Sequence, residues 1–395
     1  MPSLAGRGLY LRLSSFYFFY FASVGVIIPF WSLYLQAQKL DAAAIGTLLA
    51  VPMATKLIAP YLWGLIADRS GRRVRIIRAT SAAAVVCFAG VFLGSGFWWL
   101  LLALLGFSFF WNASLPQFEA VTMTHLRSAS ERYAGVRVWG SVGFVLTSLA
   151  LGPVLQRFGI GLVPVVMLAM FAGIWLASLA VPEAPGPATT EPAGAIAPAL
   201  KQPPVAALFL VCFLVQASHG PYYGFYSIYL QSHGYSHTAV GFLWALGVIA
   251  EVLLFLLMHR LLPRYGARNL MLSALALTVL RWLLIGWLVA SPAVVLFAQL
   301  LHAFSFGVYH AVAISLVHRF FPDSLQGRGQ ALYSSLSFGA GGSLGIFASG
   351  LLWEHLSPAV TFTLAAVAAA VGWLVALSAL HPEHYRGPLS ARQAL

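Results

Sequence analysis

The sequence contains very few charged residues. Asp, Glu, Lys and Arg make up 8% of its 395 residues, whereas hydrophobic residues make up 60%. A water-soluble globular protein cannot cover its surface with so few charges, so this composition excludes a soluble fold. Only two cysteines are present, Cys87 and Cys212, and each lies in an apolar stretch. We predict that both cysteines are small packing residues, and two cysteines are too few for a disulfide framework.

The motifs that carry common enzyme chemistry are also missing. We find no glycine-rich phosphate loop ending in lysine, no cluster with metal-ligand spacing and no serine nucleophile motif. The polar segments are too short to form a separate signalling domain. The sequence therefore predicts neither an enzyme nor a sensor, and it predicts no cofactor.

Long apolar runs are what the sequence does contain. The mean hydropathy is +0.86. Runs of about 18 to 25 residues, enough to cross roughly 30 Å of hydrocarbon, recur along the chain. The first run is too long for the core of a signal peptide and predicts a retained span. We predict an all-α membrane protein with twelve transmembrane helices, near residues 13–36, 42–66, 76–95, 97–122, 135–155, 159–181, 205–231, 237–262, 269–290, 293–320, 329–353 and 358–380.

The positive charge lies on one side of these predicted spans. The net charge is +12, and nearly all loop Lys and Arg residues fall at the termini or in even-to-odd connections, with Lys39 and Arg157 on the other side. By the positive-inside rule this pattern places both termini in the cytoplasm. It predicts a multi-pass protein of the bacterial inner membrane, in contact with the lipid bilayer, and not a nucleic-acid-binding protein.

The chain repeats itself with a constant spacing. Residues 32–36 (SLYLQ) return as residues 227–231 (SIYLQ), and Ile45-Gly46 returns as Val240-Gly241, both 195 residues later. The repeat predicts two parallel six-helix bundles, residues 1–181 and 205–395, the latter ending in a short cytoplasmic tail. The proline-rich stretch 182–204 predicts a flexible cytoplasmic linker between them. Since each half supplies a complete bundle, we expect a monomer.

Residues 64–73 (GLIADRSGRR) resemble the signature between the second and third spans of the major facilitator superfamily. Its copy 195 residues later has Pro263 in place of the aspartate. The resemblance implies a cytoplasmic charge network that gates one conformation. The alternative is that these arginines only anchor the loop. The predicted gating residues are Gly64, Asp68, Arg69, Gly71, Arg72 and Arg73.

Two acids and two arginines stand out inside the predicted spans: Glu119, Arg137, Glu251 and Arg281. A charge in hydrocarbon costs several kcal/mol, so such residues are usually paired or line a wet cavity. Glu251 and Arg281 lie deep in their spans, and we expect them to face a central cavity. Glu119 and Arg137 lie nearer an end, where an ordinary interfacial ion pair is the alternative to a substrate site.

Three of the predicted spans, the fourth, fifth and tenth, resemble those of lactose permease. The stretches around Glu119 and Arg137 look like the segments in which an acid and an arginine contact substrate. The stretch around His302 looks like the segment in which a histidine and an acid three residues later handle the proton, but Ser305 stands where that acid is expected. The proton is therefore predicted on Glu251 or Glu119, with His302 nearby. A hydrogen-bonded core histidine is the alternative for His302.

Aromatic residues gather where the helices are weakest. Tyr222 and Tyr223 follow Gly220 and Pro221 in the seventh span, and Trp31 lies near the corresponding place in the first span. Bent helices are where transporter sites occur. These three side chains are predicted to pack on an aromatic ring of the substrate, although each could equally be a packing residue.

The pattern over nearly the whole chain resembles the phenylpropionic acid permease group of the major facilitator superfamily. The likeness is carried by residues 136–142 (VRVWGSV), 222–225 (YYGF), 248–251 (VIAE) and Arg281-Trp282, among others. It implies proton-coupled import of a small aromatic carboxylate, an organic anion held by Arg137 and Arg281, by rocking of the two halves. A sugar or nucleoside permease, or an exporter, remains the alternative.

Overall fold

The computed structural model describes residues 4–126, 132–183, 197–321 and 325–381, and these residues form helices and no strand. The predicted all-helical class is confirmed. Most of the predicted linker, residues 184–196, and the predicted tail from residue 382 lie outside the described residues. The predicted boundaries of the bundles and the linker therefore stay predictions.

Eleven helical segments among the described residues are long and apolar enough to cross a membrane, one fewer than the twelve predicted. The difference lies in residues 237–288, where the predicted eighth and ninth spans follow one another with only Gly266 between two helices. The helices of this region are α12 (His237–Tyr265) and α13 (Ala267–Leu288). Together they form one segment of 52 residues, whose join around Gly266 carries Arg260, Arg264 and Arg268.

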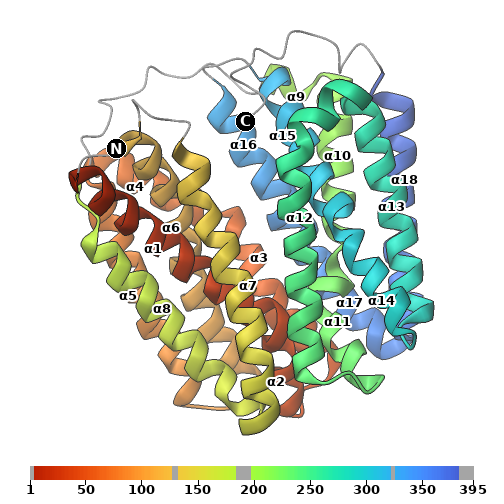
Figure 1. Cartoon of the computed structure of the whole chain (residues 1–395), viewed down its shortest axis with the longest axis horizontal. Helices are drawn as coiled ribbons and strands as arrows, with labels where there is room; N and C mark the ends of the chain where they lie inside the picture. The colour runs from red at the N-terminus through yellow and green to blue at the C-terminus, as the bar shows by residue number, and fades with distance from the viewer. Residues whose placement is uncertain (1–3, 127–131, 184–196, 322–324, 382–395) are drawn as a thin grey trace. The chain divides into compact units, whose positions relative to one another are not determined.

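The described helices cluster into two compact units, Met1–Thr190 with Gly234–Ala245, and Glu191–His233 with Leu246–Leu395. In the first unit α1 lies against α7 and α8, and α5 lies against α6 and α8 (Figure 1). The helices of this unit are α1 (Leu4–Val26), η1 (Ile27–Trp31), α2 (Ser32–Ala37), α3 (Ala42–Ala54), η2 (Thr55–Leu57), α4 (Ala59–Ser70), α5 (Arg73–Ala89), η3 (Gly90–Phe92), α6 (Phe97–His125), α7 (Tyr133–Phe158), η5 (Ile160–Leu162) and α8 (Val163–Ala180).

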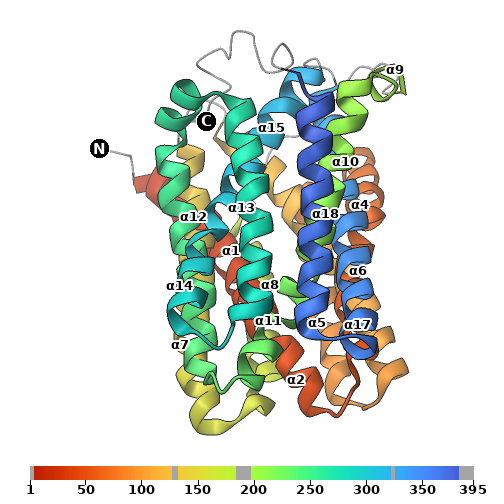
Figure 2. The ribbon, with the colours of Figure 1, turned by 90° about the vertical axis from the view of Figure 1, so that its right-hand side faces the viewer.

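The second unit has its core between α10, α13, α15 and α18. Helices α13 and α18 run side by side in this unit (Figure 2). Besides most of α12 and all of α13, its helices are α9 (Ala197–Leu200), α10 (Pro203–Ser218), α11 (Gly220–Ser232), α14 (Pro292–Leu300), η6 (Ala303–Val308), α15 (Tyr309–Phe320), α16 (Gln326–Ser334), η7 (Ser335–Gly341), α17 (Gly342–His355) and α18 (Pro358–Ala379).

The repeat seen in the sequence reappears as a repeated backbone contact. In the first unit a Cβ atom added to Gly143 of α7 would collide with the carbonyl oxygen of Phe18 in α1. In the second unit a Cβ atom on Gly341 would lie 2.6 Å from the carbonyl oxygen of Phe213 in α10. Small residues let membrane helices approach this closely. Phe18 and Phe213 are 195 residues apart and the two glycines are 198 residues apart, so corresponding spans of the two bundles make similar close contacts.

The predicted weak points are real interruptions of the helices. The seventh span consists of α10 and α11 with His219 between them, and Pro221 lies in the first turn of α11. The first span changes to a π-helix over η1, which contains Pro29. Two more π-helical turns, η6 and η7, interrupt the tenth and eleventh spans. Such turns are frequent at functional sites, because the extra residue re-aims the side chains on either side.

Candidate functional site

Arg281 is the most deeply placed charge of the second unit. It lies on α13 and is 0% exposed. Its Nε donates to the carbonyl oxygen of Ala298 at 2.9 Å, Nη2 to Oε1 of Gln299 at 2.8 Å, and Nη1 to Oγ of Ser305 at 2.9 Å. These three acceptors are uncharged. The hydrogen bonds of the guanidinium are therefore satisfied by the protein, but its positive charge still needs a counter-charge farther away.

That partner is reached through His302. Nη1 of Arg281 lies 3.2 Å from Nδ1 of His302, and Nε2 of His302 lies 3.3 Å from Oε2 of Glu251. A guanidinium can only donate, so Nδ1 must accept and the proton of the neutral ring sits on Nε2. Nε2–H then points at the Glu251 carboxylate. We call these three residues the Arg281–His302–Glu251 triad. When Glu251 is ionised, the triad has one positive and one negative charge, separated by a neutral imidazole ring.

The local backbone explains how these side chains meet. His302 directly precedes the π-helical turn η6, whose extra residue places Ser305 beside Arg281. Glu251 lies on α12, where a Cβ atom on Gly307 would come within 3.3 Å of its Cγ. The glycine thus leaves room for the carboxylate side chain against η6. Three separate spans, α12, α13 and the one containing η6, build the triad.

Two aromatic rings cover the Arg281 guanidinium. Its Cζ lies 4.1 Å from the centroid of the Tyr222 ring and 4.8 Å from that of Trp282. The Tyr222 hydroxyl is 3.3 Å from Oε1 of Gln299, the amide that also binds Arg281. Ring faces stabilise a desolvated cation by about 2 kcal/mol. Tyr223 lies beside this group, with its ring centroid 5.5 Å from that of Tyr222.

The first unit holds the second predicted pair. Nε of Arg137 on α7 is 4.0 Å from Oε1 of Glu119 on α6, and the two side chains are 32% and 41% exposed. The guanidinium lies 4.0 Å above the ring centroid of Phe21. An ion pair this long and this accessible contributes little to stability. Unlike Arg281, Arg137 keeps an accessible fork that a carboxylate could bind.

Trp31 is placed among other aromatic rings of the first unit. It is 2% exposed and stacks on Tyr34 with 4.9 Å between ring centroids, and Phe88 lies 5.9 Å away. None of its ring contacts among the described residues involves Glu119 or Arg137. Its predicted role in binding a substrate ring therefore stays a prediction, beside a clear packing role.

The predicted gating residues lie at the turn between α4 and α5. Asp68 forms an ion pair with Arg73, and Nη1 of Arg73 donates to Oε1 of Gln117 on α6 at 2.6 Å. Gly71 caps α4 with φ +62°, a left-handed conformation that favours glycine. A Cβ atom on Gly64 would lie 3.3 Å from Nε2 of Gln117.

The two remaining predicted gating residues are Arg72 and Arg69. Arg72 forms the start of α5, where its backbone N–H donates to Oγ of Ser70 at 3.3 Å, and Arg69 lies in the last turn of α4. Glu183, which sequence analysis missed, accepts from the N–H groups of Val74 and Arg75 at 2.8 and 3.2 Å. A carboxylate at a helix N-terminus is stabilising, but a contact over more than 100 residues leaves no local signal.

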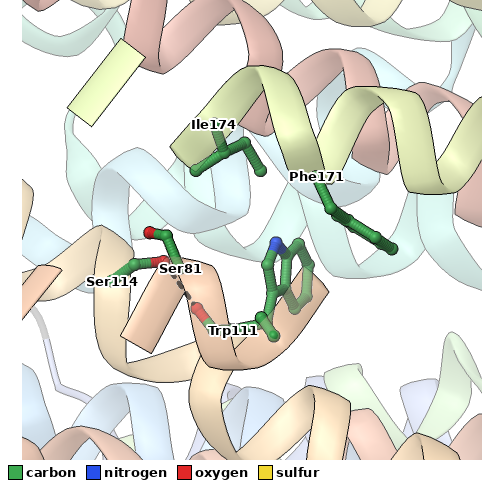
Figure 3. Close-up of a pocket in the computed structure, with 6 residues that line it drawn as sticks. Ser81, Trp111, Ser114, Phe171 and Ile174 are labelled. Carbon is green, nitrogen blue, oxygen red and sulfur yellow. Dashed lines mark hydrogen bonds between the residues drawn. The ribbon is translucent and has the colours of Figure 1, made fainter. Parts of the chain in front are cut away.

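A small pocket lies between α5, α6 and α8. It is lined by Ser81, Ala84, Trp111, Ser114, Phe171 and Ile174 (Figure 3) and has no room even for a water molecule. Pockets for small-molecule ligands are usually about 300–1,000 Å³. This one is too small for a substrate. Among the described residues no group of three or more His, Cys, Asp or Glu side chains could hold a metal ion.

Comparison with known proteins places the chain in a family. Residues 10–364 match the MFS_1 like family. The chain is 31% identical over 366 residues to the probable 3-phenylpropionic acid transporter of Escherichia coli K12, covering 89% of this chain and 93% of that protein. It is 25% identical over 371 residues to the maltose permease of Geobacillus stearothermophilus, covering 92% of each.

The solved structures agree on the fold. A crystal structure of a mutant of the nucleoside transporter NupG superposes with a TM-score of 0.86 at 18% identity, over 94% of this chain and 100% of that one. A bacterial homologue of the lysosomal transporter Spinster, in an inward-facing and occupied conformation, gives a TM-score of 0.74 at 15% identity, over 96% and 98% of the two chains. At these identities the likeness shows a shared transporter fold.

Proposed function

Because the chain belongs to the MFS_1 like family of major facilitator transporters, and is a multi-pass membrane transporter and not an enzyme, we propose that it imports a small aromatic carboxylate together with a proton. The Arg281–His302–Glu251 triad carries this proposal. The relative whose name includes 3-phenylpropionic acid supports the class of substrate.

The proposed coupling of proton binding to substrate binding follows from the charge balance of the Arg281–His302–Glu251 triad. With Glu251 ionised, its negative charge compensates Arg281 through the neutral imidazole of His302. When Glu251 takes up a proton, the positive charge of Arg281 is left uncompensated in a low-dielectric site, where an anion is strongly favoured. A substrate carboxylate can then replace the neutral acceptors of the guanidinium with stronger charge-assisted hydrogen bonds. Proton and anion therefore bind together, and their joint net charge is zero.

The other predicted residues take supporting roles in this proposal. Arg137 offers the substrate carboxylate a more accessible guanidinium, with Glu119 as its counter-charge and a second candidate for the proton. Tyr222, Tyr223 and Trp31 supply ring faces for an aromatic substrate. Alternating access of the two bundles, as in the rest of the superfamily, would move the substrate. We further propose a monomer in the bacterial inner membrane with both termini in the cytoplasm.

Uptake into proteoliposomes tests the proposal. With an inward proton gradient, labelled 3-phenylpropanoate should accumulate in vesicles containing the protein. Glu251→Gln should abolish accumulation above equilibrium, because glutamine cannot bind and release a proton. Exchange of internal for external substrate should continue. Glu354→Gln, an exposed carboxylate on α17, is the matched control and should accumulate substrate normally. Full accumulation by Glu251→Gln would exclude the coupling role.

A sugar or nucleoside is the second candidate class. Relatives named as a maltose permease and a putative nucleoside transporter align over most of the chain, and the accessible Glu119–Arg137 pair could bind hydroxyl groups. Competition of labelled 3-phenylpropanoate uptake with unlabelled sugars and nucleosides separates the classes. Inverted vesicles, in which the direction of flux is reversed, separate import from export.

A further inference from the structure

His219 is a fully buried histidine at the break between α10 and α11, with 0% exposure. Its Nδ1 lies 2.7 Å from the carbonyl oxygen of Val215. A carbonyl oxygen can only accept, so Nδ1 carries the proton and Nε2 of the neutral ring is left with a lone pair. Within the described part of the chain, Nε2 has no hydrogen-bond partner. The ring therefore presents a buried acceptor in need of a donor.

The surroundings of this acceptor connect it to the proposed substrate site. The His219 ring lies edge-on to Trp282, with 4.8 Å between centroids, and stacks on Tyr223 at 5.6 Å. Tyr222 lies 6.5 Å away. Trp282 and Tyr222 are the same two rings that cover the Arg281 guanidinium. His219 and Arg281 thus face one aromatic wall from different positions within the second unit.

The chemistry of the acceptor selects a class of ligand. An ionised carboxylate has no proton to donate, so the group that binds Arg281 cannot also satisfy Nε2. The donor must be a second group, and the aromatic rings around the His219 ring favour one carried on a flat apolar body. An O–H on the ring of an aromatic carboxylate meets both conditions.

We propose that His219 is a specificity residue that accepts a hydrogen bond from a ring hydroxyl of the transported aromatic acid. The proposal rests on the function proposed above and names its substrate as a hydroxyphenyl-alkanoate. Leaving a buried acceptor unpaired is unfavourable, and a bound hydroxyl removes that penalty. A site built to bind a hydroxyl also rejects the analogue that lacks it far better than an apolar pocket can discriminate by size.

Binding to the purified full-length protein tests this inference. Three probes are compared by titration calorimetry: 3-phenylpropanoate, 3-(3-hydroxyphenyl)propanoate and 3-(4-hydroxyphenyl)propanoate. We expect one hydroxylated acid to bind about tenfold or more tightly than 3-phenylpropanoate, the factor that a satisfied buried acceptor provides.

Two substitutions distinguish the roles of the two ring nitrogens of His219. In His219→Asn the side-chain amide can still donate to Val215, but nothing replaces Nε2; in His219→Gln the longer side chain can place an oxygen near the Nε2 position. The preference for the hydroxylated acid should vanish in the asparagine variant and return in part in the glutamine variant. Thermal unfolding without ligand checks that both variants fold.

His233 provides the matched control at the other end of α11. Its Nδ1 makes the same bond to the carbonyl oxygen four residues earlier, that of Tyr229, at 3.0 Å, but the residue is exposed. His233→Asn should leave the preference unchanged. Equal binding of all three acids by the wild-type protein would overturn the role of His219 while the proposed transport of aromatic acids stands. No binding of any of the three would overturn both.

Discussion

At the scale of single residues, the charges buried in the second unit are arranged to cancel. Arg281 donates only to neutral acceptors and reaches its counter-charge through the imidazole of His302. A salt bridge in direct contact would hold both ions fixed. A neutral ring between them keeps Glu251 accessible to a proton while Arg281 stays in place.

This arrangement predicts a specific pattern of stability. Arg281→Gln should destabilise the protein by about 3–5 kcal/mol, because it leaves Glu251, whose side chain is 16% exposed, without its counter-charge. The double variant Arg281→Gln with Glu251→Gln should recover most of that loss, since neither charge remains. Thermal unfolding in detergent measures both. Arg137→Gln, at a third-exposed site, is the control and should change stability by less than about 1 kcal/mol.

The double variant decides between charge compensation and simple packing. If Arg281 mattered only because it fills space between Tyr222 and Trp282, removing Glu251 as well would not restore stability. A double variant as unstable as the single one would therefore contradict the charge balance on which the proposed coupling depends.

The three residues of the Arg281–His302–Glu251 triad could be predicted from the sequence, but the contacts between them could not. Glu251, Arg281 and His302 stand out as ionisable groups in apolar spans. That His302 links the other two, and that Gln299 and Ser305 bind Arg281, depends on the π-helical turn η6. One extra residue in a turn rotates every following side chain, and no periodicity in the sequence marks it. His219 was missed because an unpaired ring nitrogen becomes visible only when its neighbours are known.

At the scale of helices, chain length and hydropathy predict the spans well, and glycine and proline mark where they bend. The break at His219 and the π-turn at η1 fall where Gly220, Pro221 and Pro29 weaken the helix. The number of membrane-length segments differs from the predicted twelve by one because only Gly266 separates α12 from α13, so that the two helices form a single segment of 52 residues. The predicted spans 237–262 and 269–290 still correspond to these two helices, because the polar residues around Gly266, among them Arg260, Arg264 and Arg268, mark the join in the sequence.

The turn between α4 and α5 is the element that we propose as a gate. Arg73 binds both Asp68 and Gln117 of α6, so the turn is tied to a third helix. Asp68→Asn removes the ion pair but can keep a hydrogen bond. We expect slower uptake, by about fivefold or more, with an unchanged Kd for substrate, because a coupling of about 1 kcal/mol is lost from one conformation.

Stopped-flow uptake and equilibrium binding measure the two quantities separately. Asp41→Asn is the matched control, because Asp41 caps α3 through the N–H of Ala44, and asparagine caps equally well. It should change neither quantity. If Asp68→Asn also left the rate unchanged, the arginines of this turn would serve only to anchor it, the alternative that the sequence allowed.

At the scale of the whole molecule, family membership explains the two related bundles, whereas the charges differ between them. Corresponding spans make similar close contacts at Gly143 and Gly341, yet among the described residues only the second unit holds a fully buried arginine linked to an acid through histidine. The first unit has a longer, accessible pair. Symmetry in the scaffold with asymmetry in the charges is what a carrier needs if one bundle responds to the proton more strongly than the other.

Proton coupling in the whole transporter can be read from binding alone. Because protonated Glu251 favours the anion, the affinity for an aromatic carboxylate should rise as the pH falls. By linkage, the anion must in turn favour the proton. Adding 3-phenylpropanoate to the protein in weakly buffered solution should therefore take up about one proton per bound molecule, seen as a rise in pH. Glu251→Gln should bind with a Kd that no longer depends on pH and should take up almost none. Proton uptake by this variant equal to that of the wild type would move the coupling to Glu119, and Glu119→Gln would then be expected to abolish it.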